Sequence, residues 1–272
     1  MSIERRHVPD ANRLSVLLAV VLLSYVLAQL IEREQYAVFF QLFGVDYSFD
    51  FEPTSLAIWF AAGLTASGID WLLRGHPQYD GRRTLPHWIL PALTALVLGI
   101  SLYNMPLGPL WWLGFGLGGA LLLLVLVAEY IALDSSDVRH PAASAGLMAL
   151  SFALFVILAS ALSYAGVRLT VLVLAIFPAA GMVTLRAIHL QSGNWDILWS
   201  LTSAFILTQF AAAFHYWPLE PVQHGLALLG PLYALTGLTM NLREQVSPRR
   251  AGVDALAGLG VFWLAALLLG GG

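Results

Sequence analysis

Residues 168–191 read RLTVLVLAIFPAAGMVTLRAIHLQ, and this stretch decides the fold class. It is apolar for almost its whole length, and about 20 apolar residues in a helix are enough to cross the hydrocarbon core of a bilayer. Two ionisable side chains, Arg186 and His189, lie near its second end. Long apolar runs with a few polar groups near their ends recur along the chain. An all-α polytopic membrane protein is therefore predicted.

The composition agrees with this fold class. Of the 272 residues, 59% are hydrophobic and 11% are charged, and the mean hydropathy is +0.77. A soluble domain usually carries about 25% charged residues. So few charges do not cover a water-facing surface, which makes lipid the expected solvent for most of the chain.

Two missing residue types exclude several chemistries. The chain has no cysteine, which excludes disulfides, thiolate catalysis and iron–sulfur clusters. All 13 basic residues are arginine, and the absence of lysine excludes a retinal or pyridoxal Schiff base and a P-loop. The net charge of −3 argues neither for nor against nucleic acid, but most of the arginines lie near predicted membrane ends and form no basic platform for it.

Nine spans are predicted, and together they form one transmembrane helical domain over residues 1–272. They are read from the rule that about 20 apolar residues span the hydrocarbon core. The first follows a charged head without a clear cleavage site, so it is read as a signal-anchor. The predicted spans are 13–32, 54–74, 86–104, 108–133, 142–165, 168–190, 196–216, 222–242 and 252–270.

The arginines predict the orientation, because cytoplasmic loops of membrane proteins are enriched in basic residues. With the N-terminus in the cytoplasm, only Arg33 and Arg168 fall in outer segments. The chain is therefore expected in a bacterial inner membrane, N-terminus cytoplasmic and C-terminus extracytoplasmic. The other eleven arginines fall in inner segments: Arg5, Arg6, Arg13, Arg74, Arg82, Arg83, Arg139, Arg186, Arg243, Arg249 and Arg250.

The longest predicted extramembrane segment covers residues 32–53. Apolar and polar side chains alternate from Val45 to Phe51, which is typical of a strand. The preceding YAVFFQLF can pair with it across Gly44, so the pattern favours a short extracytoplasmic β-hairpin at 36–52. An irregular loop or a short interfacial helix is the alternative.

Charged residues about one turn inside the predicted cytoplasmic boundary form the first candidate site. A charge at membrane depth is costly and needs a partner or water. Arg186 can donate to two carboxylates at once, so we predict that it bridges Asp70 and Glu129, with His189 at the edge of the cluster. Asp70 and Arg74 are also spaced i, i+4 and can satisfy each other. The cluster is either a packing device or an ion, proton or lipid-headgroup site.

The second candidate lies at the predicted outer face, in FHYWPLEPVQHG. His215 and His224 stand on either side of a tight turn, with Glu220 between them. Two histidines on neighbouring helices can ligate b-type haem, and with a carboxylate they can hold a divalent metal. Interfacial histidines without a ligand are commoner. No metal and no cofactor are therefore predicted, and b-type haem stays an alternative.

No catalytic motif accompanies these residues. HExxH, histidine boxes, GxSxG and a P-loop are all absent from the sequence. The mid-depths of the spans are mostly apolar, which suits a lipid-like ligand or no ligand. The sequence therefore favours a non-enzymatic structural or lipid-binding role, with membrane lipids as partners. The alternatives are a small-solute or proton-coupled transporter using the inner cluster, and a membrane enzyme or haem protein acting on a lipid or quinone.

Overall fold

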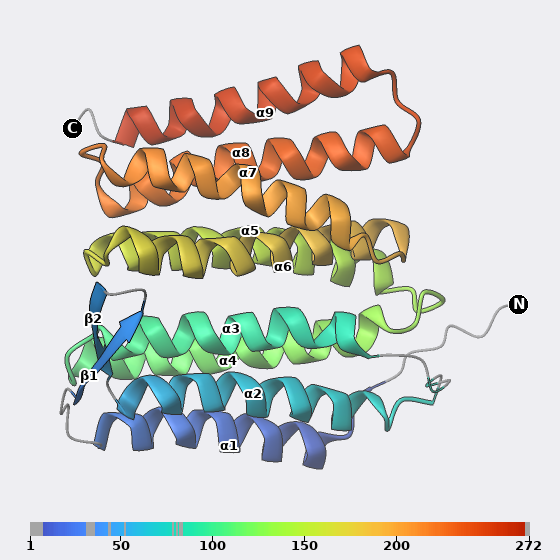
Figure 1. Cartoon of the computed structure of the whole chain (residues 1–272). Coiled ribbons are helices and arrows are strands. Elements are labelled where there is room, and N and C mark those ends of the chain that lie inside the picture. Colours follow the sequence, from blue (N-terminus) through green and yellow to red (C-terminus); the bar gives the residue numbers. More distant parts are fainter. Residues whose placement is uncertain are drawn as a thin grey trace, which may run out of the picture. The chain divides into compact units, whose positions relative to one another are not determined.

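The computed structural model describes residues 8–30, 36–42, 45–51, 53–77, 79, 81 and 84–269. Within these residues the chain forms nine long helices and two short strands (Figure 1). Their order is α1 (Ala11–Leu30), β1 (Tyr36–Leu42), β2 (Val45–Phe51), α2 (Pro53–Leu73), α3 (Leu85–Tyr103), α4 (Pro109–Ala132), α5 (His140–Tyr164), α6 (Leu169–Ser192), α7 (Ile197–His215), α8 (Pro221–Arg243) and α9 (Pro248–Leu269).

The nine helices of the described residues are all long and apolar enough to cross a membrane. Most begin within two residues of the predicted position. The largest difference is in α9, which begins at Pro248 rather than near residue 252. Proline is favoured in the first helical turn, because the backbone N–H it lacks would have no partner there. The same reason applies to α3, α4, α5 and α8, which carry proline at their first or second position.

The chain divides into two compact units, Met1–Val138 and Arg139–Gly272. Unit 1 contains α1 to α4, and α2 packs mainly on α1 and α3. Its core includes Leu17, Val21, Tyr25 and Trp111. The Tyr25 hydroxyl donates a hydrogen bond of 2.6 Å to the carbonyl oxygen of Ala95, which fixes α1 against α3. The prediction of a single domain over residues 1–272 stays a prediction.

Two antiparallel strands lie at the end of unit 1 where α1 ends and α2 begins (Figure 1). In their register Tyr36 pairs with Phe51 and Leu42 pairs with Val45. Residues 43, 44 and 52 of the predicted hairpin lie outside the described residues, as do the side chains of both strands. The packing of this segment on helix ends or lipid at an outer face stays a prediction.

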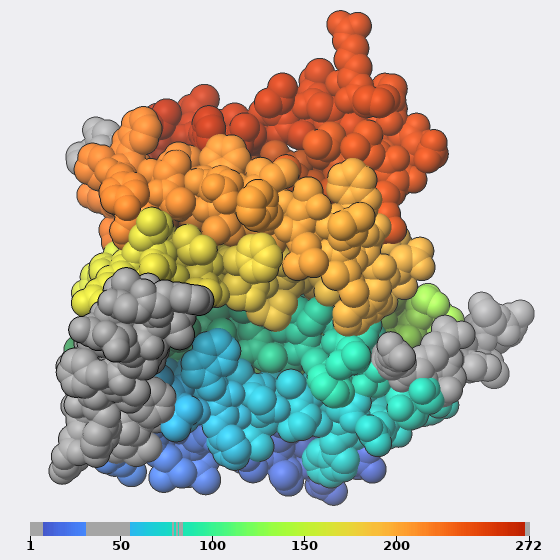
Figure 2. Space-filling model, viewed as in Figure 1, coloured from blue at the N-terminus to red at the C-terminus, as the bar shows by residue number. Residues whose placement is uncertain are grey.

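Unit 2 contains α5 to α9. Helix α8 is at its centre and contacts α5, α6, α7 and α9. Helix α9 contributes much of the outside of this unit, drawn in red in Figure 2. Beyond its first turn most of its exposed side chains are apolar, as expected for a helix that faces lipid, and they include Val253, Leu256, Val261, Leu264, Leu267 and Leu268.

Candidate functional site

Asp70, in the last turn of α2, has partners on both sides. Its Oδ2 lies 2.8 Å from Nε of Arg74, four residues along the chain, as the i, i+4 spacing predicted. The hydroxyl of Thr84, just before α3, donates to its Oδ1. Trp88 Nε1 in turn donates to Thr84 Oγ1 at 3.1 Å. The carboxylate therefore links the end of α2 to the start of α3.

Glu129 is paired with a residue that the sequence reasoning missed. His87 Nδ1 lies 2.7 Å from Glu129 Oε2. The Glu129 side chain is fully buried, and that of His87 is 9% exposed. His87 is in the first turn of α3 and Glu129 is in the last turn of α4, so the antiparallel packing of these helices brings them together. In the sequence, His87 could have been singled out as a polar residue in the first turn of a span. Its pairing with Glu129 could not, because the pairing depends on how α3 and α4 are rotated about their axes.

Arg186 and His189 lie on α6, in unit 2. The Arg186 side chain is almost completely buried, at 1% exposure. His189 is in the last turn, where its ring makes an edge contact with Trp195 at 6.3 Å between centroids. Asp70 and Glu129 belong to unit 1. The predicted bridge from Arg186 to these two acids stays a prediction.

Glu220 of the second candidate site is used to start a helix. It is the N-cap of α8, where it forms a capping box with Gln223. The Glu220 backbone N–H donates to Gln223 Oε1 at 2.9 Å. Such a reciprocal pair satisfies backbone donors that the first turn of a helix leaves unpaired. Glu220 is therefore held at the helix start, and it is not among the residues that line the pocket described next.

His215 and His224 do lie in one pocket, which we call the histidine pocket. Its volume is about 170 Å³, and its wall combines polar groups with leucine, valine and phenylalanine side chains. The His224 side chain is buried, with 4% of the residue exposed. Its Nε2 has no hydrogen-bond partner among the described residues. The pocket is lined by Leu162, Ser163, Gly166, Val167, Leu172, Phe214, His215, Trp217, Leu219 and His224.

The close approach of α8 to α5 positions His224. A Cβ on Gly225 would overlap Oγ of Ser160 and would lie 2.8 Å from the carbonyl oxygen of Val156. Only glycine lets the two backbones come this close. The next residue back along α8 is His224, so this contact places its imidazole beside the end of α5, where Leu162 lines the pocket.

The chemistry available in the histidine pocket is hydrogen bonding. A buried polar atom without a partner costs about 1–3 kcal/mol, and a ligand that supplies a donor or acceptor removes this cost. Zinc sites in proteins use three or four protein ligands. Among the described residues no group of three or more His, Cys, Asp or Glu side chains could hold a metal ion.

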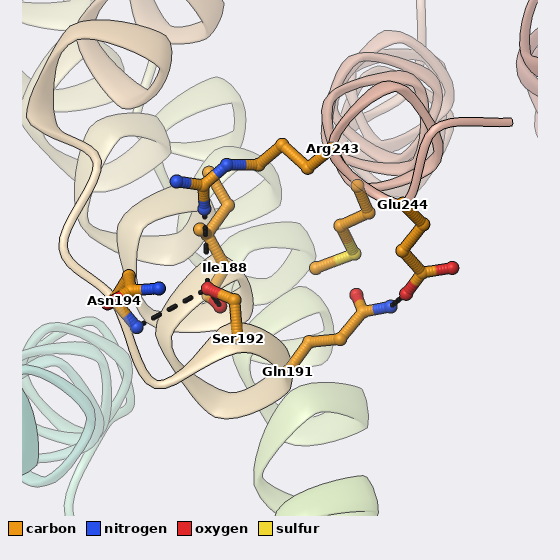
Figure 3. Close-up of a pocket in the computed structure, with 7 residues that line it drawn as sticks. Ile188, Gln191, Ser192, Asn194, Arg243 and Glu244 are labelled. Atoms are coloured by element: carbon orange, nitrogen blue, oxygen red, sulfur yellow. Dashed lines mark hydrogen bonds between the residues drawn. The ribbon is translucent and has the colours of Figure 1, made fainter.

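A second pocket lies at the opposite end of α6 and α8, and we call it the arginine pocket. It has a volume of about 380 Å³ and is lined by Ile188, Gln191, Ser192, Asn194, Met240, Arg243 and Glu244. In Figure 3 the side chains of Arg243 and Glu244 lie on different sides of it. From the sequence alone, Arg243 was expected only as a basic residue of an inner loop.

The polar groups of the arginine pocket are held by neighbours. Arg243 Nη2 lies 2.9 Å from Oδ2 of Asp196, the N-cap of α7. Its Nη1 donates to Ser192 Oγ at 3.3 Å. On the other side the amide of Gln191 donates to the Glu244 carboxylate (Figure 3). The guanidinium and the Glu244 carboxylate are thus fixed by different partners.

Comparison with known proteins identifies one family. Curated proteins and solved structures give no match. The model of the family described as "Protein of unknown function (DUF5656)" matches residues 33–269. The matched range contains α2 to α9, with both the histidine pocket and the arginine pocket. Because it covers most of the 272 residues, the chain belongs to the DUF5656 family.

Proposed function

We propose that this chain is a multi-pass protein of the bacterial inner membrane, with its N-terminus in the cytoplasm, that binds an amphipathic, lipid-like ligand in the histidine pocket without catalysing a reaction. The nine helices in the described part of the chain, each able to span a membrane, support the location. Arginines concentrated in alternate loops support the orientation. With this orientation the histidine pocket opens at the extracytoplasmic boundary.

The observation that carries the proposal is the buried Nε2 of His224. Buried polar atoms in folded proteins almost always have a partner. This one has none among the described residues and belongs to a side chain that lines a pocket. A ligand oxygen at this position would satisfy the imidazole. Leucine, valine and phenylalanine side chains around it match an apolar ligand body, as is usual for small-molecule sites.

The size of the pocket indicates which part of the ligand it holds. A volume of about 170 Å³ corresponds to five or six water molecules at roughly 30 Å³ each. This suits the polar head of a lipid or quinone rather than the whole molecule. Tyr216 and Trp217, with 77% and 65% exposure, are at the adjacent turn. Such rings are favoured at the boundary between lipid and water, where the apolar part of the ligand would leave the pocket.

The experiment is extraction of bound lipids from the full chain purified in mild detergent, followed by mass spectrometry. We expect a lipid-like compound in an amount close to one per protein. His224→Phe removes the hydrogen bond and narrows the pocket, so the amount recovered should fall about tenfold or more. Ser163→Phe fills the same pocket but keeps His224, and it should give the same loss.

His140→Phe is the matched control, because His140 is a partly buried histidine of unit 2 that does not line the pocket. Its extract should equal that of the unchanged chain. If the extracts of the unchanged chain and of both pocket variants have the composition of the bulk membrane, the proposal is wrong. An absorption spectrum of the same preparation tests b-type haem. A Soret band would show that the bound ligand is haem and not a lipid-like compound.

A second candidate, proton-coupled transport, is favoured by the His87–Glu129 pair. An imidazole and a carboxylate are buried here 2.7 Å apart, and ionisable side chains buried within membrane-spanning helices are typical of proton pathways. The test is proton uptake by proteoliposomes containing the full chain and a pH-sensitive dye. Uptake that is lost in Glu129→Gln and kept in Glu244→Gln would favour transport over ligand binding alone.

A further inference from the structure

The arginine pocket carries opposite charges on two sides. Arg243 bonds to Asp196 and Ser192, and Glu244 bonds to Gln191. No ion pair joins Arg243 to Glu244 within the described part of unit 2. The two charges therefore stay apart across a space of about 380 Å³. This volume lies in the range of small-molecule sites, roughly 300–1,000 Å³.

Both charged groups keep capacity for a ligand. A guanidinium has five N–H donors, and Arg243 uses two of its nitrogens for the contacts with Asp196 and Ser192. Its side chain is 31% exposed, so it can be reached. A carboxylate accepts about four hydrogen bonds, and Glu244, which is exposed, accepts one from Gln191.

From this arrangement we propose that the arginine pocket binds a zwitterionic head with a phosphate and a primary ammonium, that of an aminophospholipid. The phosphate contacts Arg243, because guanidinium groups bind phosphate through paired N–H donors. The ammonium donates to Glu244, on the other side of the pocket. A purely anionic head would place a negative charge against Glu244. A quaternary ammonium carries no N–H to donate.

The source of this head is the lipid bilayer. Ile188 and Met240 give the pocket an apolar part, and Met240 adapts its shape easily because its side chain is unbranched. The pocket is formed at the ends of α6 and α8, which is where a membrane-spanning helix reaches the headgroups. This location depends on the proposed membrane embedding but not on the histidine pocket.

The test is native mass spectrometry of the delipidated full chain in mild detergent. Three phospholipids with identical acyl chains are titrated: phosphatidylethanolamine, phosphatidylcholine and phosphatidylglycerol. We expect phosphatidylethanolamine to bind about tenfold more tightly than the other two, since one charge-assisted hydrogen bond is at stake. Soluble O-phosphoethanolamine is the competitor in a separate arm.

Two variants test the ammonium contact and the phosphate contact of the head separately. Glu244→Gln keeps a partner for Gln191 but removes the charge, so the preference for phosphatidylethanolamine over phosphatidylcholine should fall from about tenfold to about twofold or less. Arg243→Gln should weaken the binding of all three phospholipids. Arg249→Gln is the matched control, because Arg249 is exposed, lies near the same helix ends and does not line the pocket.

Each outcome has a definite meaning. Binding of soluble O-phosphoethanolamine as tightly as phosphatidylethanolamine would assign the free head, rather than the lipid, as the ligand of the pocket, and would overturn the bilayer source. Equal affinity for the three phospholipids, or a preference that survives Glu244→Gln, would overturn the proposal. The lipid recovered from His224→Phe is measured independently of these results. Failure of the arginine-pocket proposal is therefore distinct from failure of the histidine-pocket function.

Discussion

The indole Nε1 of Trp263 donates a hydrogen bond of 3.1 Å to the carbonyl oxygen of Ala227. In a regular helix this carbonyl would accept from the backbone N–H of residue 231, but that residue is Pro231, which has none. Helix α9 therefore supplies the donor that α8 lacks. A second bond of 3.2 Å runs from Gln223 Nε2 to the carbonyl of Ala266, in the last turn of α9, where carbonyls have no partner within the helix.

Trp263→Phe should destabilise the protein by about 0.6–2 kcal/mol, because it leaves the Ala227 carbonyl unpaired. Pro231→Ala supplies the missing N–H within α8. In that background Trp263→Phe should cost about 1 kcal/mol less. Unfolding of the four variants by denaturant in detergent measures this coupling. Equal costs in both backgrounds would show that the proline and the indole are independent.

Gly225→Ala should destabilise unit 2 by about 1–3 kcal/mol, since the added methyl group meets the backbone of α5 and has no space to move into. Gly237→Ala is the control on the same helix, because nothing lies within 4 Å of its added Cβ. That change should be neutral or stabilising by about 0.5–1 kcal/mol. Thermal unfolding in detergent compares them. A Gly225→Ala variant as stable as Gly237→Ala would contradict the close contact of α5 and α8.

His87→Leu should cost about 1–3 kcal/mol, because it removes a hydrogen-bond partner from the fully buried Glu129. The comparison is Arg74→Gln, which breaks the Asp70 pair at a side chain that is 62% exposed. Exposed ion pairs contribute about 1 kcal/mol or less. Denaturant unfolding gives both values. If Arg74→Gln is the more damaging change, burial does not set the strength of these two pairs.

The proposed orientation can be tested with single cysteines, because the chain has none of its own. Pro77→Cys and Ser247→Cys lie in loops expected in the cytoplasm, and Tyr216→Cys lies in an outer turn; all three positions are exposed. A membrane-impermeant maleimide applied to spheroplasts should label only the third. Different labelling at positions 77 and 247 would refute the alternation of nine spans.

The predicted bridge between the two units also has a thermodynamic signature. If Arg186 contacts Asp70, Arg186→Ala and Asp70→Asn should each destabilise the full chain, and the double variant should cost less than their sum. Additive costs, measured by unfolding in detergent, would mean that the two side chains do not touch.

The sequence by itself determined the helices and, apart from the start of α9, their ends to within two residues. Whether a segment is apolar and long enough to span a membrane is a local property, so nine stretches could be read one at a time, and the Asp70–Arg74 pair followed from spacing along one helix. Tertiary structure decided which side chains meet. His87 reaches Glu129, and His224 is buried in the wall of the histidine pocket, only because neighbouring helices are rotated and pressed together in one way. That rotation depends on packing across the bundle, such as the contact at Gly225, and no single stretch of sequence specifies it.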